Sequence, residues 1–94
     1  MANVFFGKVQ TNNEYVEFEE WSGITLTPGT SYLMQFQGVA CIYVGPTAPQ
    51  STPELRAQDG FLLQNNQIFQ YTPNATDKLW IKNFGAVAYF NVAT

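Results

Sequence analysis

The sequence predicts an all-β fold: a single-domain antiparallel β-sandwich of jelly-roll-like type, or a small barrel, with about seven or eight strands. Short runs rich in Val, Ile, Tyr, Phe, Trp and Thr alternate with clusters of Gly, Pro and Asn. Helix signals are nearly absent. The one short helical turn that we expect lies at residues 53–57, where Pro53 follows the capping candidates Ser51 and Thr52. Because 94 residues is the length of one domain, we expect residues 1–94 to form a single unit.

The first expected strand covers residues 4–10 and opens on the apolar residues Val4, Phe5 and Phe6. Apolar residues this close to a chain end fray unless another segment pairs with them. Two arrangements account for them. Residues 1–10 form an edge strand of the domain's own sheet, or they form an N-terminal arm that docks on a neighbouring subunit.

The second expected strand covers residues 15–21, and a short strand follows at 24–26 before a Pro-Gly turn. Side chains of a strand alternate between its two faces. Tyr15, Glu17 and Glu19 are therefore expected on one face of the second strand.

The middle of the chain holds two expected strands and one long loop. Residues 31–37 alternate in a way that suits a sheet with two distinct faces, whereas residues 40–44 are almost continuously apolar, which favours a strand buried on both faces. Residues 46–59 contain three of the five prolines and are expected to form a loop, longer than the median of about 4–6 residues.

The last third of the chain is expected to hold four strands, at residues 61–63, 67–72, 79–83 and 87–92. Asn65 and Asn66 separate the first two, and Asn tolerates the positive φ that a tight hairpin requires. Phe84 and Gly85 separate the last two strands, which we expect to pair as a hairpin.

Alternation within these strands also predicts the core. Most of it should come from Tyr32, Met34, Phe36, Ile42, Val44, Leu62, Ile68, Leu79, Ile81, Phe90 and Val92. The single cysteine, Cys41, lies in the apolar run 40–44 and is expected to be a buried small hydrophobe.

The composition argues against several classes of function. The net charge is −3, and the only four cations are scattered along the chain: Lys8, Arg56, Lys78 and Lys82. We therefore expect no nucleic-acid partner, since binding to phosphates needs a basic stripe. The chain has no His, so we expect no catalytic triad, no metal and no cofactor. Apolar runs stay far below the roughly 18 residues of a membrane span, and no signal peptide is visible, so we expect synthesis in the cytoplasm and no membrane partner.

Four of the seven acidic residues fall within one short segment: Glu14, Glu17, Glu19 and Glu20. The simplest interpretation is a solvated strand face that discourages edge pairing. Two close carboxylates could instead serve as the acid and base of a glycosidase, or the acids could bind a divalent cation together with other oxygen ligands. A chain of this size leaves little room for a glycosidase cleft, and we expect no enzyme.

Aromatic residues make up 16% of the chain, while charged residues make up 12%, about half the usual share of roughly 25%. Such an excess of rings belongs either in the core or at an interface. The candidate interface residues are Val4, Phe5, Phe6, Trp21, Tyr43 and Trp80. A core position is equally compatible with the pattern at Trp80, and Trp21 is expected to be partly exposed.

Several short motifs follow one another in a distinctive order. They are Trp21, Ile24-Thr25-Leu26-Thr27-Pro28-Gly29, Tyr32-Leu33-Met34-Gln35, Gly38, Val44-Gly45-Pro46-Thr47-Ala48-Pro49, Gly60-Phe61-Leu62-Leu63, Tyr71-Thr72-Pro73 and Asp77-Lys78-Leu79-Trp80-Ile81. This order resembles that of small phage-encoded virion proteins of the capsid decoration (cement) or head-fibre type, over roughly residues 21–94. The resemblance implies a β-sandwich, often threefold assembly, and no catalytic residue. The chain departs from the pattern in its longer connection at 47–59 and its acidic second strand.

Together these observations predict a non-enzymatic structural virion protein that binds a capsid or another virion surface. Its expected location is the virion, and its expected partners are the major capsid protein or another virion protein, with itself as a homo-oligomer, a trimer being favoured. The alternative is a carbohydrate- or host-surface-binding module. Its candidate stacking rings would be Tyr15, Trp21, Tyr43 and Tyr71.

Overall fold

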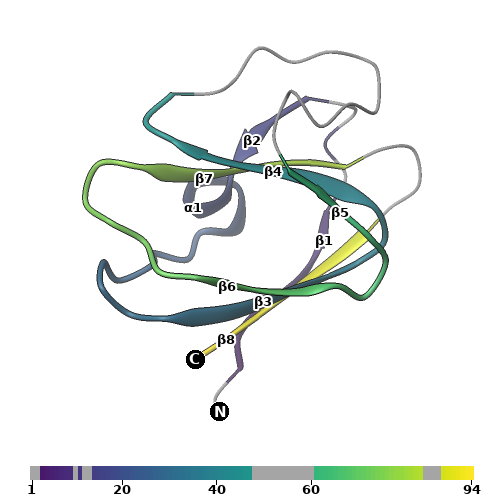
Figure 1. The fold of residues 1–94 in the computed structure, drawn as a ribbon, viewed down its shortest axis with the longest axis horizontal. Coiled ribbons are helices and arrows are strands. Elements are labelled where there is room, and N and C mark those ends of the chain that lie inside the picture. Colours follow the sequence, from purple (N-terminus) through teal and green to yellow (C-terminus); the bar gives the residue numbers. More distant parts are fainter. Residues whose placement is uncertain (1–2, 10, 12–13, 48–60, 84–87) are drawn as a thin grey trace.

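The computed structural model describes residues 3–9, 11, 14–47, 61–83 and 88–94. In this part of the chain, eight strands form two four-stranded antiparallel sheets that pack face to face, with one short helix beside them (Figure 1). The elements are β1 (Asn3–Val9), β2 (Val16–Glu17), α1 (Phe18–Ser22), β3 (Tyr32–Gln37), β4 (Ala40–Gly45), β5 (Phe61–Leu63), β6 (Ile68–Tyr71), β7 (Lys78–Asn83) and β8 (Ala88–Ala93). The expected all-β sandwich is confirmed.

The strand order is that of a jelly roll. Sheet A runs β1-β8-β3-β6 and sheet B runs β2-β7-β4-β5. The first strand pairs with the eighth, the second with the seventh, the third with the sixth and the fourth with the fifth, as in a ribbon of paired strands wrapped into two layers. Consecutive described strands therefore lie in opposite sheets, except β4 and β5.

This topology shows that two expected hairpins are wrong. β7 lies between β2 and β4 in sheet B, whereas β8 lies between β1 and β3 in sheet A, so the strands on either side of residues 84–85 do not pair. Asn66 does adopt a positive φ of 64°, but β5 and β6 that flank it also lie in different sheets. Turn residues in a sequence indicate that the chain reverses direction. Whether the strand after the turn pairs with the strand before it, or crosses to the other sheet, depends on strands that are far away in the sequence.

The second expected strand is corrected to a two-residue strand followed by a helix. The carboxylate of Glu17 accepts a hydrogen bond from the backbone N–H of Glu19 and caps α1. Gly23 ends the helix with a φ of 76°, and its N–H donates to the carbonyl of Glu19 at 3.0 Å. No strand forms at 24–26. The helix still buries Phe18 completely, and Leu26 is buried as well.

Most of the expected core is confirmed. Buried members are Tyr32, Met34, Phe36, Ile42, Leu79, Ile81, Phe90 and Val92, and Cys41 is buried as expected. Ala40, in the strand expected to be buried on both faces, is also buried, whereas the list of expected core residues missed Phe18, Leu26, Leu63 and Tyr71. The core is centred on rings, since Phe36 stacks on Phe90 with centroids 4.3 Å apart and Phe18 meets Phe90 edge-on at 5.3 Å.

Three expected core residues are wrong or only partly right. Ile68 is 61% exposed because it pairs with Gln35, on the face of sheet A that points away from sheet B. Val44 is 40% exposed near the end of β4. Leu62 is only half-buried, because the next residue, Leu63, faces the core. A one-residue error in register moves a side chain to the opposite face.

The N-terminal segment forms part of the domain's own sheet. β1 pairs with β8 along its length and is an edge strand of sheet A, with an irregularity in register between Asn3 and Phe5. Asn3 pairs with Ala93, so the first and last described strands lie side by side. The expected helical turn at 53–57 lies outside the described residues, as does most of the expected loop at 46–59.

Candidate functional site

The three apolar residues at the start of β1 point in different directions. Phe5 faces the core, where its ring meets Phe18 and Trp21 edge-on at centroid distances of 5.7 and 5.3 Å. Val4 is half-buried against the same cluster. Phe6 points outward, is 52% exposed, and stacks on Tyr89 with centroids 5.6 Å apart and ring planes 7° apart. Only Phe6 of the three is therefore placed for contact with a partner.

The outer face of sheet A is formed by side chains that point away from sheet B. It consists of Phe6, Lys8, Leu33, Gln35, Gln37, Ile68, Gln70, Tyr89, Asn91 and Ala93. Lys8 is the only charged residue among these ten. The remainder are aromatic, aliphatic or amide side chains, and a shallow depression of about 150 Å³ lies around Leu33, Ile68 and Asn91. A surface of this composition suits protein contact.

A second surface is the tryptophan groove, a hollow of about 430 Å³ at the junction of β2, α1 and β7. It is lined by Tyr15, Val16, Glu17, Glu20, Trp21 and Trp80. Two candidate interface residues, Trp21 and Trp80, thus come together here although 59 positions separate them in the sequence. Tyr43 pairs with Trp80 in the neighbouring strand, and it is half-buried.

Both indole rings of the groove are held in place by the protein. The Nε1–H of Trp80 donates to the carbonyl of Gly45 at 3.0 Å. Trp21 packs against Phe5 and lies tilted against Phe18 with centroids 6.1 Å apart. Each ring is half-buried, so one part is anchored in the protein and the rest is accessible.

The four clustered acids are divided by the helix. Glu17 and Glu20 line the tryptophan groove, Glu19 turns to the other side of α1, and Glu14 is exposed. The expectation that Glu17 and Glu19 share a strand face is therefore wrong, because the chain is helical from Phe18. Within the described part of the chain, no three His, Cys, Asp or Glu side chains are grouped to hold a metal ion.

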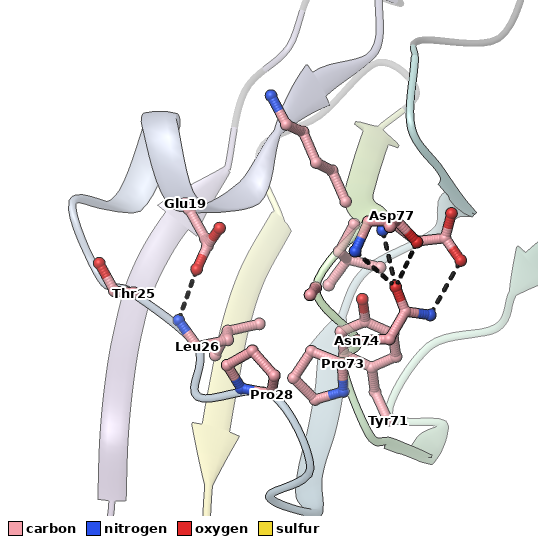
Figure 2. A pocket seen from close by; sticks show the side chains of 12 residues that line it. Glu19, Thr25, Leu26, Pro28, Tyr71, Pro73, Asn74 and Asp77 are labelled. Atoms are coloured by element: carbon pink, nitrogen blue, oxygen red, sulfur yellow. Dashed lines mark hydrogen bonds between the residues drawn. The ribbon is translucent and has the colours of Figure 1, made fainter.

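Glu19 lines a third surface, which we call the proline pocket (Figure 2). It has a volume of about 260 Å³ and lies between the segment 25–28 and the segment 71–79. A carboxylate oxygen of Glu19 accepts the backbone N–H of Leu26 at 2.6 Å, and Gly29 N–H donates to the carbonyl of Pro73 at 2.9 Å. The first bond ties α1 to the segment 25–28, and the second joins the turn that follows this segment to the segment 71–79.

The opposite wall is a turn organised by Asn74. Its Oδ1 accepts the backbone N–H groups of Thr76 and Asp77 at 2.9 and 2.7 Å, and its Nδ2 donates to the Asp77 carboxylate at 2.9 Å (Figure 2). The polar side chains of this wall thus form hydrogen bonds within the turn itself. These bonds are sufficient to account for the conformation of the turn.

Tyr71 forms the floor of the proline pocket and is buried, so it cannot be the exposed stacking ring that was expected. Burial raises the pKa of its phenol above the ordinary value, and the negative charges of Asp77, Glu19 and Glu17 add to the increase. The ring is accordingly a neutral member of the core at physiological pH.

The fold and these surfaces define a small jelly-roll β-sandwich whose accessible features are rings, amides and carboxylates. No protein-family model, curated protein or solved structure matches the chain. No helix in the described ranges has the length and apolar character needed to cross a membrane.

Sequence reasoning missed two exposed residues of the outer face of sheet A, namely Tyr89, which stacks on Phe6, and Ile68 on the opposite edge strand. The sequence did contain a signal that Ile68 faces outward. Phe69 and Tyr71 lie on the opposite face of the strand from Ile68, and these two larger aromatic side chains face the core. No local signal marks Tyr89, because its contact with Phe6 arises from the pairing of β1 with β8.

Proposed function

We propose that this chain is a non-enzymatic structural protein of a virion, which binds a capsid or another virion surface and decorates or stabilises it. We further propose that it acts as an oligomer, preferably a trimer. The observation that carries the proposal is the outer face of sheet A, where exposed Phe6, Tyr89 and Ile68 lie among amides.

The character of that face supports protein contact over simple solvation. Phe6 is 52% and Ile68 is 61% exposed, and Lys8 is the only charge among ten outward side chains. Protein interfaces are enriched in aromatic residues and poor in charge at their centres. Grouped exposed apolar side chains are uncommon on a surface that serves only to meet water.

The strand order supports the virion setting by analogy. Jelly rolls are frequent among viral capsid domains, although they also occur in lectins and other proteins, so the fold alone does not assign a role. The motif order over residues 21–94, which resembles small phage virion proteins, points in the same direction.

The proposal is tested on particles. Mass spectrometry of purified virions of the virus that encodes this chain should detect it, and the recombinant protein should co-sediment with particles that lack it. A Phe6→Ser/Ile68→Ser double variant should lose most of this binding. Val44→Ser is the matched control, since Val44 is 40% exposed but belongs to sheet B. Absence from particles, or full binding by the double variant, would contradict the proposal.

The oligomeric state needs its own measurement. Size exclusion with light scattering should give the mass of a trimer at micromolar concentration. A clean monomer at high micromolar concentration would contradict self-assembly, while docking of single copies on a capsid would still be tested by co-sedimentation.

Carbohydrate binding is the second candidate function. The tryptophan groove favours it, because accessible indole and phenol rings beside carboxylates are a common arrangement for stacking and bonding a sugar. A glycan array, together with tryptophan fluorescence across the sugars that it selects, tests this alternative. No hits and unchanged fluorescence would exclude it.

A further inference from the structure

We propose that the tryptophan groove binds an arginine side chain of a protein partner. The inference rests on the proposed function only in taking the partner to be a protein. It concerns a different surface from the outer face of sheet A, so the two can fail separately.

The charge of the groove is the first argument. Glu17 and Glu20 both line it, and no Lys or Arg is among its lining residues. α1 carries acidic residues in its first turn and no basic residue in its last. One oxygen of Glu17 accepts the N–H of Glu19, but this bond leaves the carboxylate charge in place. A cation would therefore enter a site of opposite sign.

One cation beside the groove, Lys82, is already engaged. The ammonium of Lys82 lies over the ring of Tyr15, 4.8 Å from its centroid, and the side chain of Lys82 is fully buried. This contact offsets part of the negative charge and occupies one aromatic face. The rings of Trp21 and Trp80 remain for an incoming group.

Those two rings are already positioned before any ligand arrives. The bond from Trp80 to Gly45 and the packing of Trp21 on Phe5 and Phe18 limit their rotation. Tryptophan offers the strongest aromatic face for a cation, and a ring ordered in advance loses little entropy on binding.

The two carboxylates of the groove favour a guanidinium. The two carboxylates of the groove accept hydrogen bonds, and the indole N–H of Trp80 is donated to Gly45. A sugar hydroxyl both donates and accepts, whereas arginine has five N–H donors and no acceptor. Arginine also stacks its planar group on aromatic rings and pairs with carboxylates, which a lysine ammonium does less well.

The probe is a blocked Gly-Arg-Gly peptide, compared with the same peptide carrying citrulline, which has nearly the same shape and no charge. Both tryptophans of the chain line the groove, so a fluorescence change reports on this site. The arginine peptide should change the emission saturably, and added salt should weaken its binding. The citrulline peptide should have little effect.

Two variants separate groove binding from general attraction to an acidic protein. Glu20→Gln should raise the Kd of the arginine peptide roughly two- to fivefold, a range typical of losing one partly screened ion pair. Glu14→Gln removes the same charge from an exposed residue outside the groove and should leave the Kd unchanged. Circular dichroism checks that both variants are folded, and the indole N–H signals of the tryptophans give a second readout of binding.

Three results would overturn the inference: no saturable response to the arginine peptide at millimolar concentration, equal weakening by the two variants, or a response to neutral oligosaccharides without one to arginine. The last result would assign the groove to carbohydrate. None of them bears on co-sedimentation with virions through Phe6 and Ile68, which tests the proposed function independently.

Discussion

At the scale of single residues, the aromatic excess divides between two roles. Phe18, Phe36 and Phe90 are fully buried, and the rings of Phe18 and Phe36 both contact that of Phe90. Phe6 and Tyr89 stack on the outside of sheet A. A ring-centred core and an exposed aromatic pair therefore account for part of the aromatic excess, and the tryptophan groove holds three further rings, those of Tyr15, Trp21 and Trp80.

A pair of isoleucines tests this division. Ile42→Ala removes a side chain that is 7% exposed and should lower the free energy of unfolding by about 2–5 kcal/mol, through lost burial and a new cavity. Ile68→Ala makes the same chemical change at a residue that is 61% exposed, so the effect should stay within about 0.5 kcal/mol. Urea unfolding measures both, and similar losses would mean that the assigned faces are wrong.

The buried phenol of Tyr71 predicts a dependence of stability on alkaline pH. Its pKa is raised in the folded protein, mainly by burial, so on unfolding the phenol becomes the stronger acid. The unfolded chain loses this proton first as the pH rises. The contribution to stability is thus fully present below pH of about 10 and is lost as the pH climbs towards the folded pKa.

We therefore expect the wild-type unfolding free energy to fall above pH of about 10, and to fall less steeply in Tyr71→Phe. Urea midpoints measured at a series of alkaline pH values check the slope. Tyr89→Phe is the control, since Tyr89 is 40% exposed on the outer face of sheet A, and it should keep the wild-type slope. An identical slope in Tyr71→Phe and wild type would contradict the assignment.

At the scale of elements, two strands carry a glycine covered by an aromatic ring two residues earlier. The ring of Phe5 lies over Gly7 in β1, and the ring of Tyr43 lies over Gly45 in β4. A Cβ atom added to Gly45 would come within 2.6 Å of the Tyr43 ring. The absent side chains give the rings room to lie along their own strands. In β1, this places Phe5 against α1.

Gly7→Ala should disturb that contact. The new methyl group would overlap the ring of Phe5, which would have to move away from Phe18 and Trp21. We expect a loss of about 1–3 kcal/mol in stability and an altered tryptophan emission. Lys8→Ala, at the next and outward-facing residue of β1, is the control. Unchanged emission in Gly7→Ala would show that Phe5 does not depend on the glycine.

At the scale of the whole molecule, a buried polar contact ties the connection between the sheets to sheet B. Thr11 lies between β1 in sheet A and β2 in sheet B, and it meets Asn83 at the end of β7. The Thr11 N–H and Oγ1 donate to Asn83 Oδ1 at 2.6 and 2.9 Å, and the Asn83 N–H donates to Thr11 Oγ1 at 2.9 Å. Residues 72 positions apart are thus joined inside the protein.

Thr11→Val preserves the shape of this side chain and removes its hydroxyl group. Asn83 then loses hydrogen bonds in a buried place, so stability should drop by about 1–3 kcal/mol. Thr27→Val, at an exposed threonine, should have little effect. Thermal unfolding of the two variants makes the comparison, and equal midpoints would contradict a stabilising role for the contact.

The sequence by itself determined the all-β class, the positions of most strands and most of the core. Alternation at every second residue is local, and it correctly placed Met34, Phe36 and Ile81 facing inward. The tertiary structure alone decided that β7 and β8 belong to opposite sheets and that Trp21 and Trp80 share a groove. Each of these depends on contacts between residues far apart in the chain, and such contacts leave no periodic signal in the sequence.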